Sequence, residues 1–295
     1  MSEKRSFLSR LMRPSKRVSV IRLSGVIGGG GRFGRGLEDA GVAELVERAF
    51  APSRLAAVAI ALNSPGGSPA QSSLIARRLR DAADDKGVPL LAFCEDVAAS
   101  GGYMIACAAD EIYVDDNSIL GSIGVVSASF GFHDAMSRMG VERRVQTAGE
   151  AKARLDPFLP EKAEDKVWLQ ALQEKIHARF IDMVVAARGA RLGETPHPDL
   201  FSGEVWLGED AVSVGLADGV GRLRPVLRER FGDDVRIDLV SPRRGLFERL
   251  GGGRIRSGSA DVGAVGADGA ALGAALAEAA FDEIERRAVW GRFGL

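Results

Sequence analysis

Two uninterrupted apolar runs constrain the fold more than any other feature of the chain. Residues 56–62 and 88–93 lack the polar alternation of a strand with one face in water. Such runs are typical of parallel strands that are buried on both faces. Between them, residues 70–84 have helical spacing, with apolar side chains recurring on one side. This strand–helix–strand order predicts an α/β fold with a mainly parallel sheet.

Other segments give weaker signals of the same kind. We expect further strands at residues 18–27, 111–114, 123–127 and 142–147, and further helices at residues 37–49, 133–139 and 161–188. The last of these helices has an apolar residue at every fourth position, namely Trp168, Leu172, Ile176, Phe180 and Val184. That spacing predicts an apolar face that packs on the sheet or on a neighbouring subunit.

Shifts in composition divide the 295 residues into four parts. The predicted division is a basic leader at 1–17, a domain large enough to hold a catalytic site at 18–240, a Gly/Ala-rich linker at 241–273 and a C-terminal helical arm at 274–295. The leader lacks the apolar core of a signal peptide and favours a disordered segment. One of its faces is apolar, so it could also contact an anionic membrane surface peripherally. No apolar window reaches the ~18 residues of a membrane span, which predicts a cytoplasmic location.

Composition excludes several classes of function. The net charge of −1 and the pI near 6.4 do not indicate a nucleic-acid partner. With three histidines in the chain, a His-rich metal site is not expected. The two cysteines, Cys94 and Cys107, lie in apolar context and are predicted to be reduced core thiols. The glycine-rich loop at 28–36 lacks the acidic residue of a dinucleotide fingerprint and is interpreted as a mobile loop.

A small-residue elbow follows the second apolar run. Ser100 precedes Gly101 and Gly102, and an apolar stretch of helical length comes next. This arrangement would raise a hydroxyl onto the end of the sheet and leave amides free at a helix N-terminus, where negative charge is stabilised. We therefore interpret Ser100 as a nucleophile, which needs a base to remove its proton.

Two residue types could supply that base. His133, His177 and His197 all have a plausible structural role in their local sequence. Arginine cannot deprotonate in a protein, so otherwise the base must be one of seven lysines. Lys152 stands out because it lies in a loop of small residues, although its spacing alone also fits a solvated lysine. A free lysine has a pKa of ~10.4, which desolvation can lower by several units.

Five ordered motifs, covering roughly residues 18–225, resemble the signal peptide peptidase A family. They are Asn63-Ser64-Pro65-Gly66-Gly67, Ala99-Ser100-Gly101-Gly102-Tyr103, Gly121-Ser122-Ile123-Gly124-Val125, Gly149-x-x-Lys152 followed by Asp156-Pro157-Phe158, and Phe201-x-Gly203 with residues 205–218. The resemblance implies a crotonase/Clp-protease-like fold, built of repeated ββα units with a mainly parallel sheet.

The resemblance also implies a site and a mechanism. Ser100 matches the nucleophile, Lys152 the general base and Ser122 the serine that holds the lysine amine. Backbone amides of Gly66, Gly67 and Gly101 would form the oxyanion hole, with no metal or cofactor. Peptide substrates, notably remnant signal peptides, would be apolar. Family members form homo-oligomeric rings or domes, and neighbouring subunits help to build each site.

One departure from the family pattern leaves the substrate open. Many relatives carry an N-terminal membrane anchor that is not visible in this sequence, so a soluble cytoplasmic oligopeptidase fits equally well. Two alternatives use the same fold: a Clp-like Ser-His-Asp protease or a crotonase-type acyl-CoA enzyme, and a non-catalytic oligomeric scaffold.

Overall fold

The computed structural model describes residues 15–28, 36–193 and 195–241, together with Arg287, Trp290, Gly291 and Phe293. Four predicted features lie largely outside these residues: the basic leader, the glycine-rich loop, the Gly/Ala-rich linker and the C-terminal helical arm. Within the described part, no helix combines the length and the apolar composition that crossing a bilayer requires.

The described part is built on one mainly parallel sheet, as predicted. Its main path runs in the order β6-β5-β3-β2-β1-β8, with β4 beside β3 and β7 beside β4. Every pairing is parallel except that of β5 with β6. The strands are β1 (Arg17–Ser24), β2 (Leu55–Ser64), β3 (Leu90–Ala99), β4 (Glu111–Val114), β5 (Ile119–Gly121), β6 (Val205–Leu207), β7 (Gly219–Val220) and β8 (Arg236–Val240).

Strand β3 pairs with two different strands along its length, in addition to β2. Its first half, Leu91–Phe93, pairs with β4, and its last residues, Val97–Ala99, pair with β5. The sequence predicted that this strand would end at residue 93, before a polar turn. Instead Glu95 and Asp96 stay in the strand, where they are partly or fully exposed. The strand therefore runs without interruption to the residue before Ser100.

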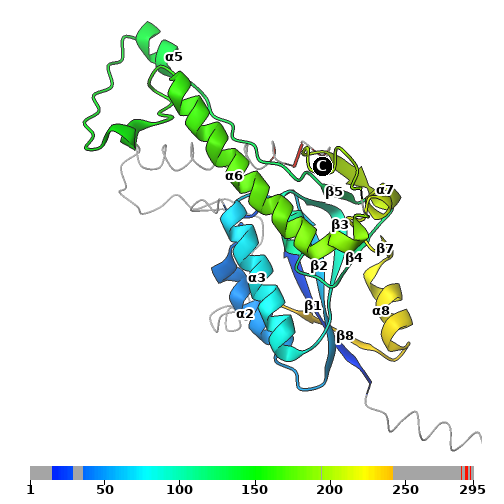
Figure 1. The fold of residues 1–295 in the computed structure, drawn as a ribbon. Helices are drawn as coiled ribbons and strands as arrows, with labels where there is room; N and C mark the ends of the chain where they lie inside the picture. The colour runs from blue at the N-terminus through cyan, green and yellow to red at the C-terminus, as the bar shows by residue number, and fades with distance from the viewer. Residues whose placement is uncertain are drawn as a thin grey trace, which may run out of the picture.

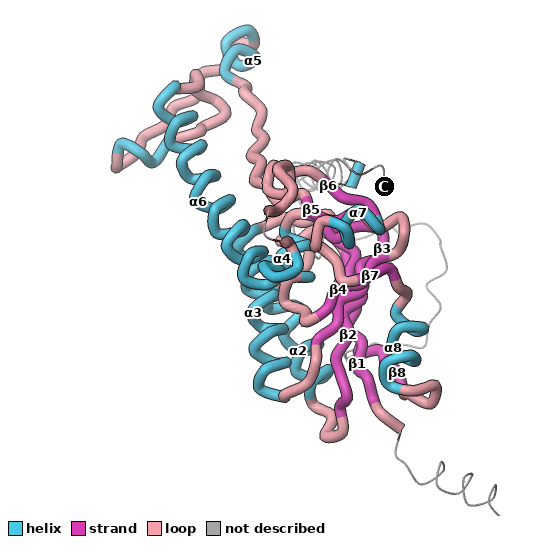
Figure 2. The backbone as a smooth tube through the Cα atoms, turned by 45° about the vertical axis from the view of Figure 1, so that its right-hand side comes forward, coloured by secondary structure: helices cyan, strands magenta, loops and turns pink. Residues whose placement is uncertain are grey.

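Helices cover both faces of the sheet (Figures 1 and 2). One core cluster joins β1, β2 and β3 to α2, α3 and α4, and the opposite cluster joins the same strands to α8. Helix α3 has clear sequence-encoded ends, with Ser68 as N-cap, Pro69 in the first turn and left-handed Gly87 at the C-cap. The helices are α2 (Asp39–Phe50), α3 (Pro69–Lys86), α4 (Gly101–Ala106), α5 (His133–Arg138), α6 (Ala163–Arg188), α7 (Gly208–Ser213) and α8 (Leu223–Phe231), with 3-10 turns η1 (Glu150–Ala153) and η2 (Gly189–Arg191).

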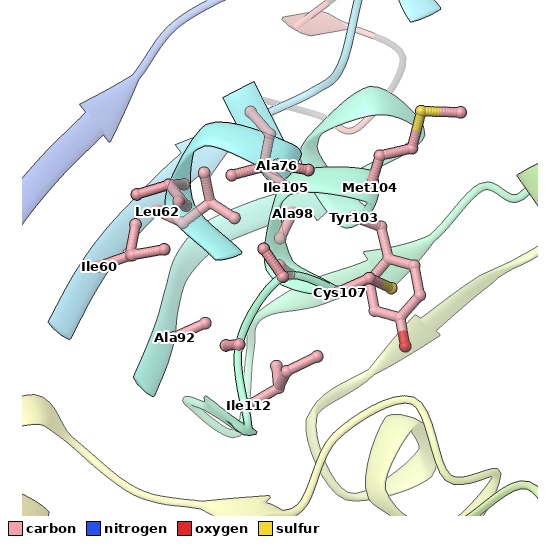
Figure 3. Close-up of a cluster of buried hydrophobic side chains, with 14 of the residues drawn as sticks. Ile60, Leu62, Ala76, Ala92, Ala98, Tyr103, Met104, Ile105, Cys107 and Ile112 are labelled. Atoms are coloured by element: carbon pink, nitrogen blue, oxygen red, sulfur yellow. The ribbon is translucent and has the colours of Figure 1, made fainter. Parts of the chain in front are cut away.

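Helix α4 is buried completely at the centre of the larger cluster. Figure 3 shows Tyr103, Ile105 and Cys107 in one apolar contact region with Leu62 of β2 and Ala76 of α3. All six residues of α4 are buried. Removing a large apolar side chain from such a site costs roughly 2–5 kcal/mol of stability. The nucleophile helix is thus held by the core of the protein.

A long segment projects beyond the sheet (Figures 1 and 2). We call residues 125–172 the projection; it contains α5, η1 and the outer part of α6. Its apolar side chains are largely exposed, namely Val126, Phe130, Phe132, Met139, Val141, Val145, Leu155, Phe158, Leu159, Val167, Trp168 and Leu172. The predicted apolar face of α6 is therefore divided: Phe180 and Val184 are buried in the core, whereas Trp168 and Leu172 are not.

Two predicted strands are absent from the structure at this point. Residues 123–127 and 142–147 form irregular backbone with no neighbouring strand. Val126 is 69% exposed and Val145 is 43% exposed. Both segments contain the β-branched residues that favour a strand, but a strand also needs a partner for its backbone hydrogen bonds. The strand in this region is the shorter β5, which ends at Gly121.

Candidate active site

Ser100 lies at the turn between β3 and α4, as the elbow motif predicted. Its backbone has φ 51° and ψ −122°, an uncommon conformation for a residue with a side chain. Two hydrogen bonds hold it: the Ser100 amide donates to the Gly121 carbonyl at 2.8 Å, and its carbonyl accepts from the Met104 amide at 3.1 Å. Strain of this kind costs about 1–3 kcal/mol and persists where the surroundings fix it. Ser100 is partly exposed, so its hydroxyl sits at the surface of a rigid elbow.

The glycine turn after β2 touches this elbow directly. A Cβ on Gly66 would come within 2.8 Å of the Ser100 Cβ and 2.9 Å of the Gly101 amide nitrogen. The φ of Gly66 is 104° and that of Gly67 is 144°, values that L-residues with side chains rarely adopt. Hydrogen bonds to Ile27 hold the turn: the Ile27 amide donates to the Gly66 carbonyl at 2.8 Å, and the Ser68 amide donates to the Ile27 carbonyl at 2.7 Å. Only glycine fits where the two loops meet.

The three amides predicted for an oxyanion hole are not equivalent in this structure. The Gly66 amide donates to the Ser64 hydroxyl at 3.2 Å. The amides of Gly67 and Gly101 donate to no other described residue, and the Gly67 nitrogen lies 3.4 Å from the position of a Cβ on Gly101. Two neighbouring free amides beside a nucleophile are the donors that a developing oxyanion needs. The sequence did not identify Ser64, whose hydroxyl also donates to the Gly25 carbonyl at 2.7 Å.

Ser122 lies close to the elbow through β5. It follows Gly121, the residue whose carbonyl accepts from the Ser100 amide. Its own φ is 49°, and its amide donates to the Glu204 carbonyl at 2.7 Å. The side chain is 9% exposed, and its hydroxyl has no hydrogen-bond partner among the described residues. Ser100 and Ser122 therefore lie on two adjacent strained turns whose backbones are hydrogen-bonded.

Lys152 lies in a different part of the structure from Ser100 and Ser122. It lies in η1 on the projection and is exposed. Figures 1 and 2 both show the projection extending away from the carboxyl end of β3. Near it, Ala153, Leu155 and Asp156 help to line a cavity of ≈ 480 Å³ that is formed by residues 129–165 alone. Within one chain, the structure does not bring Lys152 to Ser100.

The histidines also stay away from Ser100. His133 begins α5 on the projection and is exposed. The Nε2 of His177 lies 2.9 Å from the Ile123 carbonyl, and the His197 ring meets the Trp206 ring edge-on at 4.8 Å. No hydrogen bond connects any of the three to Ser100 in the part of the chain that is described. This chain therefore contains no assembled Ser-His pair.

A buried polar network helps to hold α4 in place. The Tyr103 hydroxyl donates to the Leu216 carbonyl at 2.8 Å. Arg188 is 1% exposed; it donates to the Gly215 carbonyl at 2.9 Å and pairs with Asp218 at 2.7 Å. Burial opposes ionisation of Asp218, but the Arg188 hydrogen bond and the Ile112 amide hold the pKa of this carboxyl below its ordinary value. The network fixes the C-terminal end of α6 to the strands beside the elbow.

The two cysteines are buried and free, as predicted. Burial raises the pKa of Cys94 and of Cys107 to about 12. Such thiols stay protonated at neutral pH and are poor nucleophiles. Ser100 is therefore the nucleophile candidate that the elbow presents.

Comparison with known proteins identifies the family. Residues 82–231, half of the chain, match peptidase family S49. The chain belongs to this family. It is 31% identical over 70% of its length to protease 4 of Haemophilus influenzae, of which it covers 33%. It is 33% identical over 57% of its length to the chloroplastic serine protease SPPA of Arabidopsis thaliana, of which it covers 24%.

A third relative shows how partial these matches are. The chain is 51% identical over 94% of its length to a Brucella abortus protein named Na(+)/H(+) antiporter NhaA, but it spans 37% of that protein. That name belongs to the whole longer protein, so no transport activity is carried to this chain.

Among solved structures, a mutant of the 1510-N membrane-bound stomatin-specific protease in complex with a substrate peptide matches 81% of this chain and 97% of its own. The identity is 14% and the TM-score 0.48. The match to S49 confirms the predicted family, and the described strands confirm the predicted α/β class with a mainly parallel sheet.

Proposed function

We propose that this S49 peptidase hydrolyses apolar peptides through an acyl-enzyme on Ser100. The observation that carries the proposal is the contact between two turns: a strained serine lies beside the Gly67 and Gly101 amides, which have no partner among the described residues. A tetrahedral oxyanion formed on Ser100 would accept hydrogen bonds from both amides. Donors of this kind contribute about 3 kcal/mol each to transition-state stabilisation.

The general base in this proposal is Lys152 of a neighbouring copy. Lys152 is exposed on the projection, and many apolar side chains of the projection are exposed as well, although Phe132 stacks on Phe158. Packing the projection against the sheet end of a second chain would cover both the exposed side chains and the lysine. The same packing would desolvate the amine and so lower its pKa toward that of a usable base. The Ser122 hydroxyl is the group we assign to hold this amine.

The reaction then takes a standard acyl-transfer course. Neutral Lys152 removes the Ser100 proton, and the Ser100 oxygen attacks the peptide carbonyl. Lys152 returns the proton to the leaving amine, and the peptide C–N bond breaks. Water, deprotonated by the same lysine, then hydrolyses the ester on Ser100.

The proposed partners follow from this assembly. A homo-oligomer, in the form of a ring or dome, would provide one complete site at each junction between copies. Remnant signal peptides are the proposed substrates because apolar segments suit an apolar junction. We propose a cytoplasmic enzyme whose basic leader contacts the anionic inner face of the membrane peripherally.

A test of the dyad uses three variants of the full chain. Ser100→Ala and Lys152→Ala should each lose activity on apolar peptides by at least about a thousandfold. Lys162→Ala is the matched control, because Lys162 is exposed on the same projection and lines the same cavity. A serine-reactive phosphonate should label the native enzyme at Ser100, as read by peptide mass spectrometry.

Two outcomes would reject parts of this proposal. If the Lys152→Ala enzyme retains activity while a His133→Ala enzyme loses it, the base is a histidine and the dyad is wrong. If neither substrate turnover nor a Ser100 adduct is found with the native oligomer, the chain is a scaffold with the fold of a peptidase.

A further inference from the structure

Ser72 is a buried polar residue in the first turn of α3, outside every motif that defined the site. Its side chain is 0% exposed. The Ser72 hydroxyl donates to the Ser68 carbonyl at 2.8 Å, and the Ser72 amide donates to the same carbonyl at 3.0 Å. In a helix, a serine can always make this bond to the carbonyl four residues earlier, and it adds little to helix stability. This bond alone does not explain why a hydroxyl is buried here, so we consider the side of Ser72 that faces away from the Ser68 carbonyl.

That other side faces Gly101. A Cβ on Gly101 would lie 2.3 Å from the Ser72 hydroxyl oxygen and 3.3 Å from the Ser72 Cβ. The oxygen thus lies on the side of Gly101 that a Cβ would occupy, close to one of its Cα hydrogens. The same Cβ position is 3.4 Å from the Gly67 nitrogen. Ser72 therefore contacts the residue that carries one free amide, next to the residue that carries the other.

Its two contacts make Ser72 a bridge between the two loops. Ser68, whose carbonyl fixes the hydroxyl, directly follows Gly67 and caps α3. Gly101 begins α4. A hydroxyl bonded to the first loop and packed on the second has no freedom to rotate away. Beside the direct contact of Gly66 with Ser100, this oxygen atom therefore sets how closely Gly101 approaches α3.

We propose that Ser72 is a positioning residue that sets the spacing of the Gly67 and Gly101 amides in the oxyanion hole. This inference rests on the proposed function and deepens it. Oxyanion stabilisation depends on donors that stand at the correct distance before the reaction begins. Without the Ser72 oxygen, the two loops can approach each other, and the amides no longer converge on the oxyanion. The effect falls on the transition state and leaves ground-state binding of the peptide unchanged.

The experiment compares Ser72→Ala with Ser73→Ala in the full-length enzyme. Ser73 is the next residue of the same helix, is partly exposed and has no side-chain hydrogen bond within the described residues. We expect Ser72→Ala to lower kcat about five- to tenfold with KM unchanged, and Ser73→Ala to change neither. A peptide aldehyde, which forms an oxyanion-bearing adduct on Ser100, should bind Ser72→Ala more weakly by the same factor. The product peptide should bind both variants equally.

A folded Ser72→Ala enzyme with native kcat and native aldehyde affinity would overturn the proposal. If Ser72→Ala does not fold, as judged by its thermal transition, Ser72→Cys replaces it. Cysteine exchanges the oxygen for a larger sulfur atom at the contact with Gly101, so kcat and aldehyde affinity should fall together; native values for both would again reject the proposal. Turnover and Ser100 labelling of the native enzyme are measured in parallel. Their absence would reject the proposed function itself, whereas an active native enzyme with an indifferent Ser72 rejects only the spacing role.

Discussion

The sheet end, which holds Ser100, and the projection, which holds Lys152, differ in how firmly the chain fixes these side chains. At the sheet end, Ser100 is held by two backbone hydrogen bonds, abuts Gly66 and rests on a completely buried helix. On the projection, Lys152 is exposed, and many apolar side chains are exposed with it, although some of the phenylalanine rings stack on one another. The environment of Ser100 is thus formed within one chain. The exposed apolar side chains of the projection are the surface that our proposal assigns to an interface between copies.

The prediction with the largest expected effect concerns whether the Ser100 and Lys152 of one site belong to different copies of the chain. In an equal mixture of Ser100→Ala and Lys152→Ala chains, about one quarter of the junctions in a closed assembly should carry both native residues. The mixture should recover about a quarter of native activity, although each variant alone is inactive. Peptide turnover after co-refolding measures this. Native mass spectrometry verifies mixing, and an inactive mixture of proven composition would place both residues within one chain.

The next prediction concerns the contact at the sheet end. Gly66→Ala should lower kcat at least about a hundredfold, because the new Cβ would displace Ser100 and the Gly101 amide. Gly25→Ala is the control: its φ of 114° is equally unfavourable for alanine, but nothing lies within 4 Å of the new Cβ. Both variants are compared at matched folded fraction. Equal losses would show that backbone strain, and not the contact with Ser100, explains the effect.

A third prediction contrasts a buried ion pair with an exposed one. Arg188→Met should lower the free energy of unfolding by about 1.5–3 kcal/mol, because the largely buried Asp218 loses its charged hydrogen bond to Arg188 and keeps only the partly exposed Arg191 as an arginine partner. Lys166→Met, which removes the exposed pair with Glu161 on the projection, should cause no measurable change. Urea unfolding at pH 7 measures both. Equal effects would mean that the two ends do not differ in rigidity as described.

The contribution of the Arg188–Asp218 pair to stability should depend on pH, and the direction of the change can be worked out. The folded-state pKa of Asp218 is held below its ordinary value. Its stabilising contribution is therefore complete above the unfolded pKa of ~3.9 and is lost as pH falls through the lower, folded value. The stability difference between native and Arg188→Met proteins should shrink in that acid range. A difference that stays constant down to the acid transition would contradict this account.

The smallest effect is expected on the projection. Phe130→Ser combined with Met139→Ser changes side chains that are 79% and 76% exposed, so stability of the single chain should move by less than about 0.5 kcal/mol. Assembly should weaken, and activity at low protein concentration should fall about tenfold. Sedimentation velocity and turnover across a dilution series provide the measurement. Unchanged assembly would remove the projection from the interface.

The sequence predicted those parts of the fold whose signal is local. The runs at 56–62 and 88–93 are apolar throughout because both faces of those strands are buried, and Ser100 is flanked by small residues because its elbow is crowded. The strand predictions for residues 123–127 and 142–147 were wrong, because β-branched residues favour a strand locally but do not show whether a partner strand is present. The occupied amide of Gly66 could not be foreseen, because it depends on where the Ser64 hydroxyl points.

The proposed role of Lys152 has a consequence for control of activity. If the nucleophile and the base of each site belong to different copies, a lone chain has no competent site, and activity rises more steeply than in proportion to the amount of protein. Newly made chains at low abundance would then leave other peptides intact without an inhibitor or a removable pro-segment. Dilution would act as the off state, and the projection would set the concentration at which activity begins.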